Sequence, residues 1–308
     1  MRAVVIGASG FIGSHLVDAL LVEGYEVLAM ARRLPGLITP AARAHPALKL
    51  VPLAMEDGKG LQEALRGADL AVHLASSSLP QTSNLDPHLD VKMNLLGALN
   101  VLEAVHLGGV RRLLVVSSGG TVYGLPQQVP IPESHPTEPT CSYGITKLAI
   151  EKYVALFRQL HGVDGIVLRV ANPYGERQRI EASQGVVPNF LGRALRGDAL
   201  EIWGDGSTVR DFLHISDVVA ALLAATTYVG ELNIFNVGSG RGLSLRQLVE
   251  LLEHELQRPL AVKYQPGRGF DVPTNVLCIE QARRFLNWQP QVAVAEGLRR
   301  FHQSVISG

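Results

Sequence analysis

Two residues near the middle of the chain, Tyr143 and Lys147, have the types and the spacing that proton transfer requires. Residues four apart lie on one face of a helix, so the Lys147 ammonium group is predicted to lie near the Tyr143 phenol. A phenol with a pKa of about 10 is no base at neutral pH, but a nearby cation stabilises the phenolate and lowers this pKa. The pair could therefore take or return a hydroxyl proton during an oxidation, although the pattern alone is typical of an exposed helix surface.

A second motif lies near the N-terminus, where Gly7, Gly10 and Gly13 separate an apolar strand from a helix. Gly7 is predicted to make the tight turn, Gly10 to let the backbone approach a pyrophosphate, and Gly13 to let the helix pack close to the strand. The start of that helix offers unpaired N–H groups and the positive end of a dipole to phosphate. In this position the triplet predicts a dinucleotide site, whereas in isolation it would mark an ordinary turn.

The type of dinucleotide depends on the end of the next strand, which reads EVLAMARR and carries no acidic residue at its end. In NAD-binding proteins an acid at this place often holds the ribose 2′-hydroxyl. Arg32 and Arg33 stand there instead, and guanidinium groups suit a 2′-phosphate, which favours NADP. The alternative is that both arginines are solvated loop charges and that other contacts hold the adenosine.

The elements that must position these residues alternate along the first part of the chain. Apolar, β-branched runs predict strands buried on both faces, and periodic segments between them predict helices. This alternation is typical of an α/β fold with a doubly wound parallel sheet (Rossmann), and the less regular remainder predicts a smaller, mixed α/β C-terminal substrate domain. Strands are predicted at 3–6, 26–30, 48–53, 70–74, 113–117, 165–170 and 233–236, and helices at 11–23, 59–67, 88–107, 143–161, 186–197, 216–228, 244–256 and 279–286.

The same pattern predicts the domain boundaries. Residues 1–171 form the dinucleotide-binding domain, to which 208–240 return, and residues 172–207 and 241–308 form the substrate-binding domain. The helix predicted at 88–107 is apolar on more than one face, which predicts burial on several sides. One side could face the sheet and another a second subunit, which predicts a homodimer; the alternative is full burial within the monomer.

Composition excludes several classes of protein. The 308 residues are 47% hydrophobic and 18% charged, which fits a large folded core. Lys plus Arg and Asp plus Glu each number 28, so the net charge of zero favours neither nucleic acid nor a membrane surface as a partner. The chain has two distant cysteines, no metal-ligand spacing, no signal segment and no apolar run of about 18 residues, which predicts a cytoplasmic protein without a metal site.

Taken together, these motifs resemble the extended short-chain dehydrogenase/reductase family, in particular its NAD-dependent epimerase/dehydratase branch, typified by UDP-glucose 4-epimerases. The resemblance covers nearly the whole chain and is specific to the branch, but it does not fix the sugar. The segments that carry it are GASGFIG (7–13), HLAS (73–76), NLLGALNVLEA (94–104), SSGGTVYG (117–124), YGITK (143–147), LRVANPYG (168–175), VVPNFL (186–191), WGDGSTVRDFLHISDV (203–218), NVGSG (236–240) and PGRGFDV (266–272).

The resemblance implies a role for each residue that matches a family motif. Tyr143 would be the acid and base, and Lys147 would hold the nicotinamide ribose and tune the phenol. Family resemblance favours NAD as the cofactor. The residues implied to contact it are Gly7, Gly10, Phe11, Ile12 and Gly13 at the pyrophosphate, Leu74 and Ala75 along its length, and Asn94 as a support. Those implied to hold the diphosphate of a sugar nucleotide are Asn172, Arg210 and Arg268, although Arg210 could instead form an ion pair with Asp211 or Asp217.

The chain departs from the family at Gly119, where the resemblance implies a Ser or Thr that binds the oxidised sugar hydroxyl. If the backbone stays extended, alternate residues face the same side, so Thr121 points where a side chain at position 119 would point. Thr121 is therefore the first prediction for the catalytic hydroxyl and Ser118 the second. The alternative is that Gly119 and Gly120 make room for a bulky substrate or for water, and that Tyr143 acts with little help.

Three functions remain open. The family's dehydratases carry an Asp–Glu pair where Gly120 and Thr121 stand here, so dehydration is disfavoured. The first hypothesis is a 4-epimerase of a nucleotide-diphosphate sugar, which oxidises C4 transiently with a bound nicotinamide cofactor. The second is an NADPH-dependent reductase of a 4-keto sugar nucleotide, which Arg32 and Arg33 support. The third is a catalytically weak sugar-nucleotide binder, which Gly119 suggests.

Overall fold

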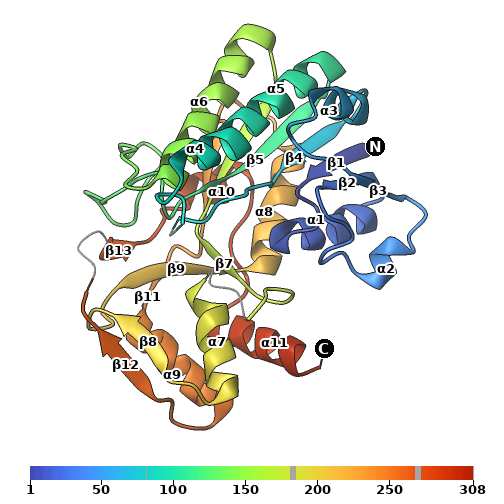
Figure 1. The fold of residues 1–308 in the computed structure, drawn as a ribbon. Coiled ribbons are helices and arrows are strands. Elements are labelled where there is room, and N and C mark those ends of the chain that lie inside the picture. The colour runs from blue at the N-terminus through green and yellow to red at the C-terminus, as the bar shows by residue number, and fades with distance from the viewer. Residues whose placement is uncertain (81, 181–184, 268–271, 308) are drawn as a thin grey trace.

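The structure, a computed structural model, describes residues 1–80, 82–180, 185–267 and 272–307. Its centre is a parallel sheet of seven strands, which confirms the α/β fold predicted from the alternating pattern (Figure 1). The chain winds outward from β1 in both directions, as in a doubly wound sheet. In spatial order the strands are β10 (Ile234–Val237), β6 (Gly165–Val170), β5 (Arg112–Ser118), β4 (Leu70–His73), β1 (Arg2–Ile6), β2 (Glu26–Ala31) and β3 (Leu48–Pro52).

Helices cover both faces of this sheet, because its central strands are apolar on both sides. One core joins the strands to α1 (Phe11–Val22) and α8 (Ile215–Thr227). The other joins them to α3 (Gly58–Leu65), α5 (Gly97–Gly108) and α6 (Ser142–His161), which Figure 1 shows on the opposite side. The short helix α2 (Pro40–Arg43) lies near the β3 edge.

The segment predicted as one helix at 88–107 is helical throughout but changes its winding. It begins as α4 (Pro87–Asp90), continues as a π-helical stretch, η1 (Val91–Leu96), and ends as α5. The π-helical turns are wider than those of an α-helix and occur often at functional sites. In this chain they lie next to the start of α6, where Tyr143 is found.

The second part of the chain packs around a hydrophobic core of its own. Its strands form one sheet of β7 (Asn172–Tyr174), β9 (Val209–His214), β11 (Gly242–Ser244) and β13 (Thr274–Asn275), and a parallel pair of β8 (Leu200–Trp203) and β12 (Val262–Gln265). Its helices are α7 (Val186–Arg196), α9 (Leu245–Leu256) and α11 (Val294–Ile306), while α10 (Glu280–Phe285) packs beside β10. The exact domain boundaries stay a prediction.

The carboxyl ends of β1, β4 and β5 meet at one edge of the large sheet, because the three strands are parallel neighbours. Ligands of open α/β sheets bind outside this edge, and the residues that follow each strand are the predicted site residues. Within the described part of the chain, no helix is both long and apolar enough to cross a membrane. In that same part, no group of three His, Cys, Asp or Glu side chains could hold a metal ion.

Candidate active site

Helix α6 begins beside the end of β5, and this contact positions Lys147. The residue is 4% exposed, and its Nζ donates a hydrogen bond to the Val116 carbonyl oxygen at 3.0 Å. The same Nζ lies 5.7 Å from the centre of the Tyr143 ring. Burial lowers the pKa of Lys147 to about 8, and the nearby Glu151 and Asp90 carboxylates oppose this fall. The structure therefore brings the predicted pair together at the site edge of the sheet.

The Tyr143 phenol does not have the lowered pKa that the Tyr–Lys spacing predicts. Burial raises its pKa to about 12, and negative charge at Cys141 and Asp90 adds to the rise. The nearby Ser76 hydroxyl acts in the opposite direction. The prediction of a lowered pKa is wrong for this structure, because burial dominates and the Lys147 ammonium group donates to the backbone.

The turn between β1 and α1 has the close approaches that the glycine spacing predicts. A Cβ on Gly13 would lie 2.3 Å from the Gly7 carbonyl oxygen, so a side chain there would separate helix from turn. Gly10, the residue before the helix, provides no side-chain cap, which leaves N–H groups of the first turn without a side-chain partner. Backbone donors at a helix N-terminus fit the pyrophosphate of a dinucleotide, and Phe11 and Ile12 form that first turn.

Leu74 and Ala75, which follow β4, lie beside this turn. The Leu74 N–H donates to the Ile6 carbonyl oxygen at 2.9 Å. A Cβ on Gly7 would lie 2.7 Å from the Ala75 nitrogen, and Gly7 has φ of +93°. A side chain at position 7 would therefore be strained as well as blocked. The predicted cofactor residues from two strand ends thus come together.

Arg32 and Arg33 lie at the exposed end of β2, where no acid stands. An Arg32 Nη donates to the Ser77 hydroxyl at 3.2 Å, which spans from the end of β2 to the loop after β4. The neighbouring Leu37 N–H donates to the Ser9 carbonyl oxygen at 3.1 Å, so the loop after β2 folds back against the glycine turn. The Arg32 guanidinium therefore lies between the end of β2 and the loop after β4, and contact of Arg32 or Arg33 with a ribose or its 2′-phosphate stays a prediction.

Asn94, predicted as a cofactor support, holds the loop after β4. Its Oδ1 accepts from the Ser77 N–H at 2.7 Å, and its Nδ2 donates to the Ser78 hydroxyl at 2.8 Å. The amide also donates to Asp90 Oδ1 at 2.7 Å. Asn94 therefore fixes the backbone of this loop, and direct contact with a cofactor stays a prediction.

Asp90 is a site residue that the sequence analysis missed. One carboxylate oxygen accepts from Ser142 Oγ at 2.6 Å and Thr146 Oγ1 at 2.9 Å, both on α6. The other accepts from Ser78 Oγ at 2.5 Å and from Asn94. One buried side chain thus joins the loop after β4 to the first turns of α6. The sequence signal was the Asp–Asn pair four residues apart on one helix, preceded by a run of serines.

Replacing Asp90 with Ala is expected to lower the free energy of unfolding by about 1–3 kcal/mol, because donors in the interior lose their acceptor. These hydrogen bonds outweigh the effect of burial and hold the Asp90 pKa below its ordinary 3.8. A lowered pKa in the folded state means that the stabilisation is fully present above 3.8 and is lost as pH falls through the folded value. Urea titrations of both proteins at neutral and acidic pH test this; a difference that grows in acid would contradict it.

The loop after β5 shows why Gly119 has no side chain. The Gly119 N–H donates to the Val170 carbonyl oxygen at 2.9 Å, and a Cβ on Gly119 would lie 2.5 Å from Leu277 Cδ1. Position 119 therefore faces an apolar side chain. Thr121 packs against Gly144, the residue after Tyr143. Its Oγ1 is buried and has no hydrogen-bond partner among the described residues, whereas Ser118 is only partly buried.

Residues 3–238 match the NAD dependent epimerase/dehydratase family. The chain belongs to this family. It is 36% identical over 304 residues to the UDP-glucose 4-epimerase of Mycolicibacterium smegmatis, with 97% of each chain covered.

Two solved structures show the same fold over the whole chain. The Thermotoga maritima UDP-glucose 4-epimerase with UDP-glucose has a TM-score of 0.93 and 34% identity, and the match covers 100% of this chain and 99% of that one. The Thermus thermophilus UDP-glucose 4-epimerase with NAD has a TM-score of 0.90 and 31% identity, with 100% of both chains covered. As a member of the epimerase/dehydratase family the chain is an enzyme, related to NAD-dependent sugar-nucleotide epimerases.

Three residues match the diphosphate contacts of the epimerase/dehydratase family, and the structure describes two of them, Asn172 and Arg210. The Asn172 amide donates to the Asp211 carbonyl oxygen at 2.9 Å. The Arg210 guanidinium donates to the carbonyl oxygens of Val209 at 2.9 Å and Val272 at 2.7 Å. The third predicted contact, Arg268, lies outside the described residues.

Proposed function

We propose that the chain is a 4-epimerase of a nucleotide-diphosphate sugar, with UDP-hexoses as the substrate class. The observation that carries the proposal is the partly buried Tyr143 phenol beside the Lys147 ammonium group, on the sheet edge that also holds the Gly7 turn. The similarity to UDP-glucose 4-epimerases over almost the whole chain supports it.

In this mechanism Tyr143 takes the proton of the C4 hydroxyl as the C4–H bond breaks, and returns it after the 4-keto sugar has turned over. A bound oxidised nicotinamide would supply the hydride acceptor and a positively charged ring. Lys147 would hold the nicotinamide ribose, and its positive charge would favour the phenolate against the burial that raises the Tyr143 pKa. Gly7, Gly10 and the first turn of α1 bind the pyrophosphate. Hydride and proton both return to the sugar, so no oxidant is consumed in a cycle.

Thr121 is the first proposed hydroxyl contact to the sugar and Ser118 the second. Buried hydroxyls normally have a hydrogen-bond partner, and the unpartnered Thr121 Oγ1 supports a contact that forms on substrate binding. Asn172, Arg210 and Arg268 are proposed to bind the substrate diphosphate, since charge-assisted bonds from arginine are strong and specific. Phe11, Ile12, Leu74 and Ala75 are proposed to line the cofactor.

The proposal is tested with UDP-glucose carrying deuterium at C4. Epimerisation transfers the deuterium away from C4 and back to the other face, so UDP-galactose forms with its label retained and without net cofactor consumption. NMR of the product measures the formation of UDP-galactose and the retention of its deuterium label. Loss of the label to solvent, or no product from any UDP-hexose, contradicts the proposal.

An NADPH-dependent reductase of a 4-keto sugar nucleotide is the second candidate, because Arg32 and Arg33 occupy the place of an acid. NAD is proposed as the cofactor on the strength of the NAD complex of the related Thermus enzyme, and NADP is the alternative. Titration with NAD and NADP of the protein and of an Arg32→Ala variant distinguishes them. Preference for NADP that disappears in the variant would identify NADP as the cofactor, which the reductase requires.

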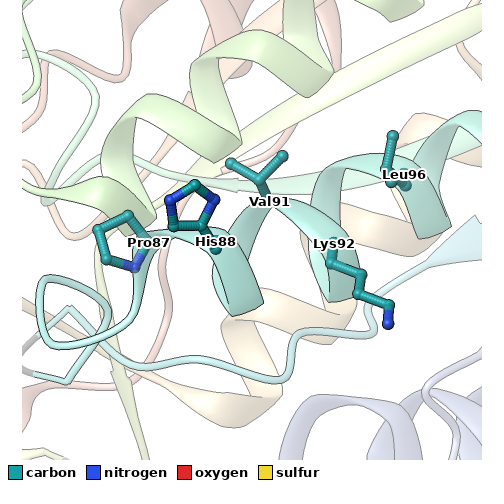
Figure 2. A pocket seen from close by; sticks show the side chains of 5 residues that line it. All are labelled: Pro87, His88, Val91, Lys92 and Leu96. Atoms are coloured by element: carbon teal, nitrogen blue, oxygen red, sulfur yellow. The ribbon is translucent and has the colours of Figure 1, made fainter.

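A homodimer is the second part of the proposal. Figure 2 shows a hollow on α4 and η1, lined by Pro87, His88, Val91, Lys92 and Leu96. Leu96 is 51% exposed there, and Leu160 on the adjacent α6 is 62% exposed. Exposed apolar side chains on neighbouring helices support a two-fold interface. Sedimentation is expected to show a dimer of the 33.2 kDa chain that Leu96→Glu dissociates; a monomeric wild type would refute it.

The cellular location stays a prediction. Cys141 and Cys278 are both free thiols in the structure, which is compatible with the reducing cytoplasm proposed for this chain.

A further inference from the structure

Asp90 binds the residue directly before Tyr143 and the residue directly before Lys147. Its Oδ2 accepts from Ser142 Oγ at 2.6 Å and from Thr146 Oγ1 at 2.9 Å. These two hydroxyls lie four residues apart, which is also the spacing of the Tyr–Lys pair, so one oxygen holds the helical turn that carries the pair. Figure 1 shows α4, which ends at Asp90, beside the start of α6.

The other carboxylate oxygen of Asp90 holds the loop after β4. This Oδ1 accepts from Ser78 Oγ at 2.5 Å and from Asn94 Nδ2 at 2.7 Å. Asn94 lies one turn further on, in the π-helical stretch η1, and it accepts in turn from the Ser77 N–H at 2.7 Å. Asp90 is 2% exposed, and hydrogen bonds shielded from water are electrostatically stronger than exposed ones. One carboxylate therefore fixes the distance between this loop and the first turns of α6.

The backbone at the start of α6 is bound to the same loop. Cys141, the residue before the helix, provides no side-chain cap. Instead, Asn84 Oδ1 accepts from the Ser142 N–H at 2.8 Å, and Ser83 Oγ accepts from the Tyr143 N–H at 3.0 Å. The first N–H groups of a helix have no partner within it, so the loop that precedes α4 supplies their acceptors.

We propose that Asp90 is a positioning residue, which sets the orientation of Tyr143 and Lys147 relative to the loop after β4; this inference rests on the proposed function. That loop begins with Leu74 and Ala75, which are proposed to line the cofactor. Asp90 acts through the hydroxyls of α6 and not on the sugar. A displacement of about 1 Å in a catalytic group can lower the rate roughly 100-fold, so loss of these hydrogen bonds reaches the proton transfer.

The charge of Asp90 acts in the opposite sense to its hydrogen bonds. Burial is the largest cause of the raised Tyr143 pKa, and the charges of Cys141 and Asp90 add to it, while the ammonium group of Lys147 lies over the ring. Burial also lowers the Lys147 pKa to about 8, which Glu151 and Asp90 oppose. Removal of the Asp90 charge therefore lowers both pKa values, and the range of pH in which phenolate and ammonium coexist moves down.

Two replacements of Asp90 separate its hydrogen bonds from its charge. In Asp90→Asn the carbonyl oxygen can face the loop and the amide group can donate to both hydroxyls of α6, because a hydroxyl donates and accepts. Asp90→Ala removes both sets of contacts. The maximum of kcat over pH is expected to stay within about threefold of wild type in Asp90→Asn and to fall roughly 10- to 100-fold in Asp90→Ala. The pH of that maximum should move down in both variants.

A third variant keeps the charge and removes only the contacts to α6. Ser142→Ala combined with Thr146→Val leaves the Asp90 carboxylate bound to the loop. Its maximal kcat should fall as in Asp90→Ala, but the pH of the maximum should not move down. The matched control is Asp57→Asn, at the exposed N-cap of α3, where the side chain accepts from the Gly60 N–H. Asn caps helices as well as Asp does, so this control should behave as wild type.

Crystal structures of the NAD⁺-loaded proteins give a readout that needs no turnover. The Tyr143 phenol should be displaced from its wild-type position in Asp90→Ala and should coincide with it in Asp90→Asn. An undisplaced phenol in Asp90→Ala, or equal kcat maxima in the two Asp90 variants, overturns the inference. Absence of epimerisation by the wild type refutes the proposed function, and the crystal structures then still decide whether Asp90 positions Tyr143.

Discussion

Replacement of Tyr143 with Phe is expected to lower kcat about 10²- to 10⁴-fold, the contribution of a positioned acid–base group. The ring and its packing remain, and only the hydroxyl that transfers the proton is removed. Because Lys147 Nζ is held by the Val116 carbonyl oxygen and not by the phenol oxygen, the ammonium group keeps its place. The affinity for NAD and for the sugar nucleotide, measured by calorimetry, is therefore expected to change little.

Tyr153 provides the matched control for this substitution. It lies on the same helix and is 36% exposed, so Tyr153→Phe should retain wild-type kcat. If Tyr143→Phe were as active as Tyr153→Phe, Tyr143 would not be the acid and base. If wild type and Tyr143→Phe both bound the sugar nucleotide without turnover, the chain would be a sugar-nucleotide binder, the third hypothesis raised by Gly119.

The parts of the site that follow from local spacing could be predicted from the sequence. Gly7 and Gly13 bracket a strand–helix turn, and the close contacts of Gly13 are with Gly7 and Ala8 of that same turn. Tyr143 and Lys147 share a helix face because helices repeat about every 3.6 residues. The sheet was predictable for a similar reason, since strands buried on both faces must be continuously apolar.

The parts that depend on contacts distant in sequence could not be predicted. Asp90 meets Ser142 and Thr146 across 52 and 56 positions, and no local pattern signals that meeting. The direction of the missing side chain at Gly119 is set by Leu277, far along the chain. Thr121 was chosen by assuming an extended backbone, which is wrong: residues 119–121 form a turn in which the Thr121 and Val122 N–H groups donate to the Ser118 carbonyl oxygen. The raised pKa of Tyr143 is likewise a sum over its surroundings, whereas the helix spacing revealed only the one cation.

A buried ion pair beneath the site leads to the second large prediction. Arg169 on β6 and Glu151 on α6 are joined by Nη2 and Oε2 at 2.6 Å, with side chains 4% and 2% exposed. Ser117 donates to the same carboxylate at 2.5 Å, and Tyr123 accepts from Arg169 at 2.9 Å. Arg169→Met leaves the carboxylate buried without its cation. The free energy of unfolding should fall by about 3–5 kcal/mol, the usual cost of breaking a buried pair.

Urea unfolding measures this loss, and the exposed pair of Arg299 and Glu296 gives the control. Arg299→Met should change stability little, because exposed ion pairs are screened by solvent. The double variant Arg169→Met with Glu151→Leu removes both charges and should regain most of the lost stability, since apolar replacements of buried pairs are often neutral. A double variant no more stable than Arg169→Met would show that packing, and not the unpaired charge, caused the loss.

The double variant also links this pair to catalysis. Glu151 follows Lys147 by one helical turn, and its charge opposes the fall of the Lys147 pKa to about 8. Without that carboxylate the Lys147 pKa falls further, so the ammonium group is lost at lower pH. When kcat is measured as a function of pH, its fall on the alkaline side should therefore begin at lower pH in the double variant than in wild type, even though the stability is restored. If kcat fell at the same alkaline pH in a folded, active double variant as in wild type, the ion pair would only stabilise the fold and would not maintain the charge beside Tyr143.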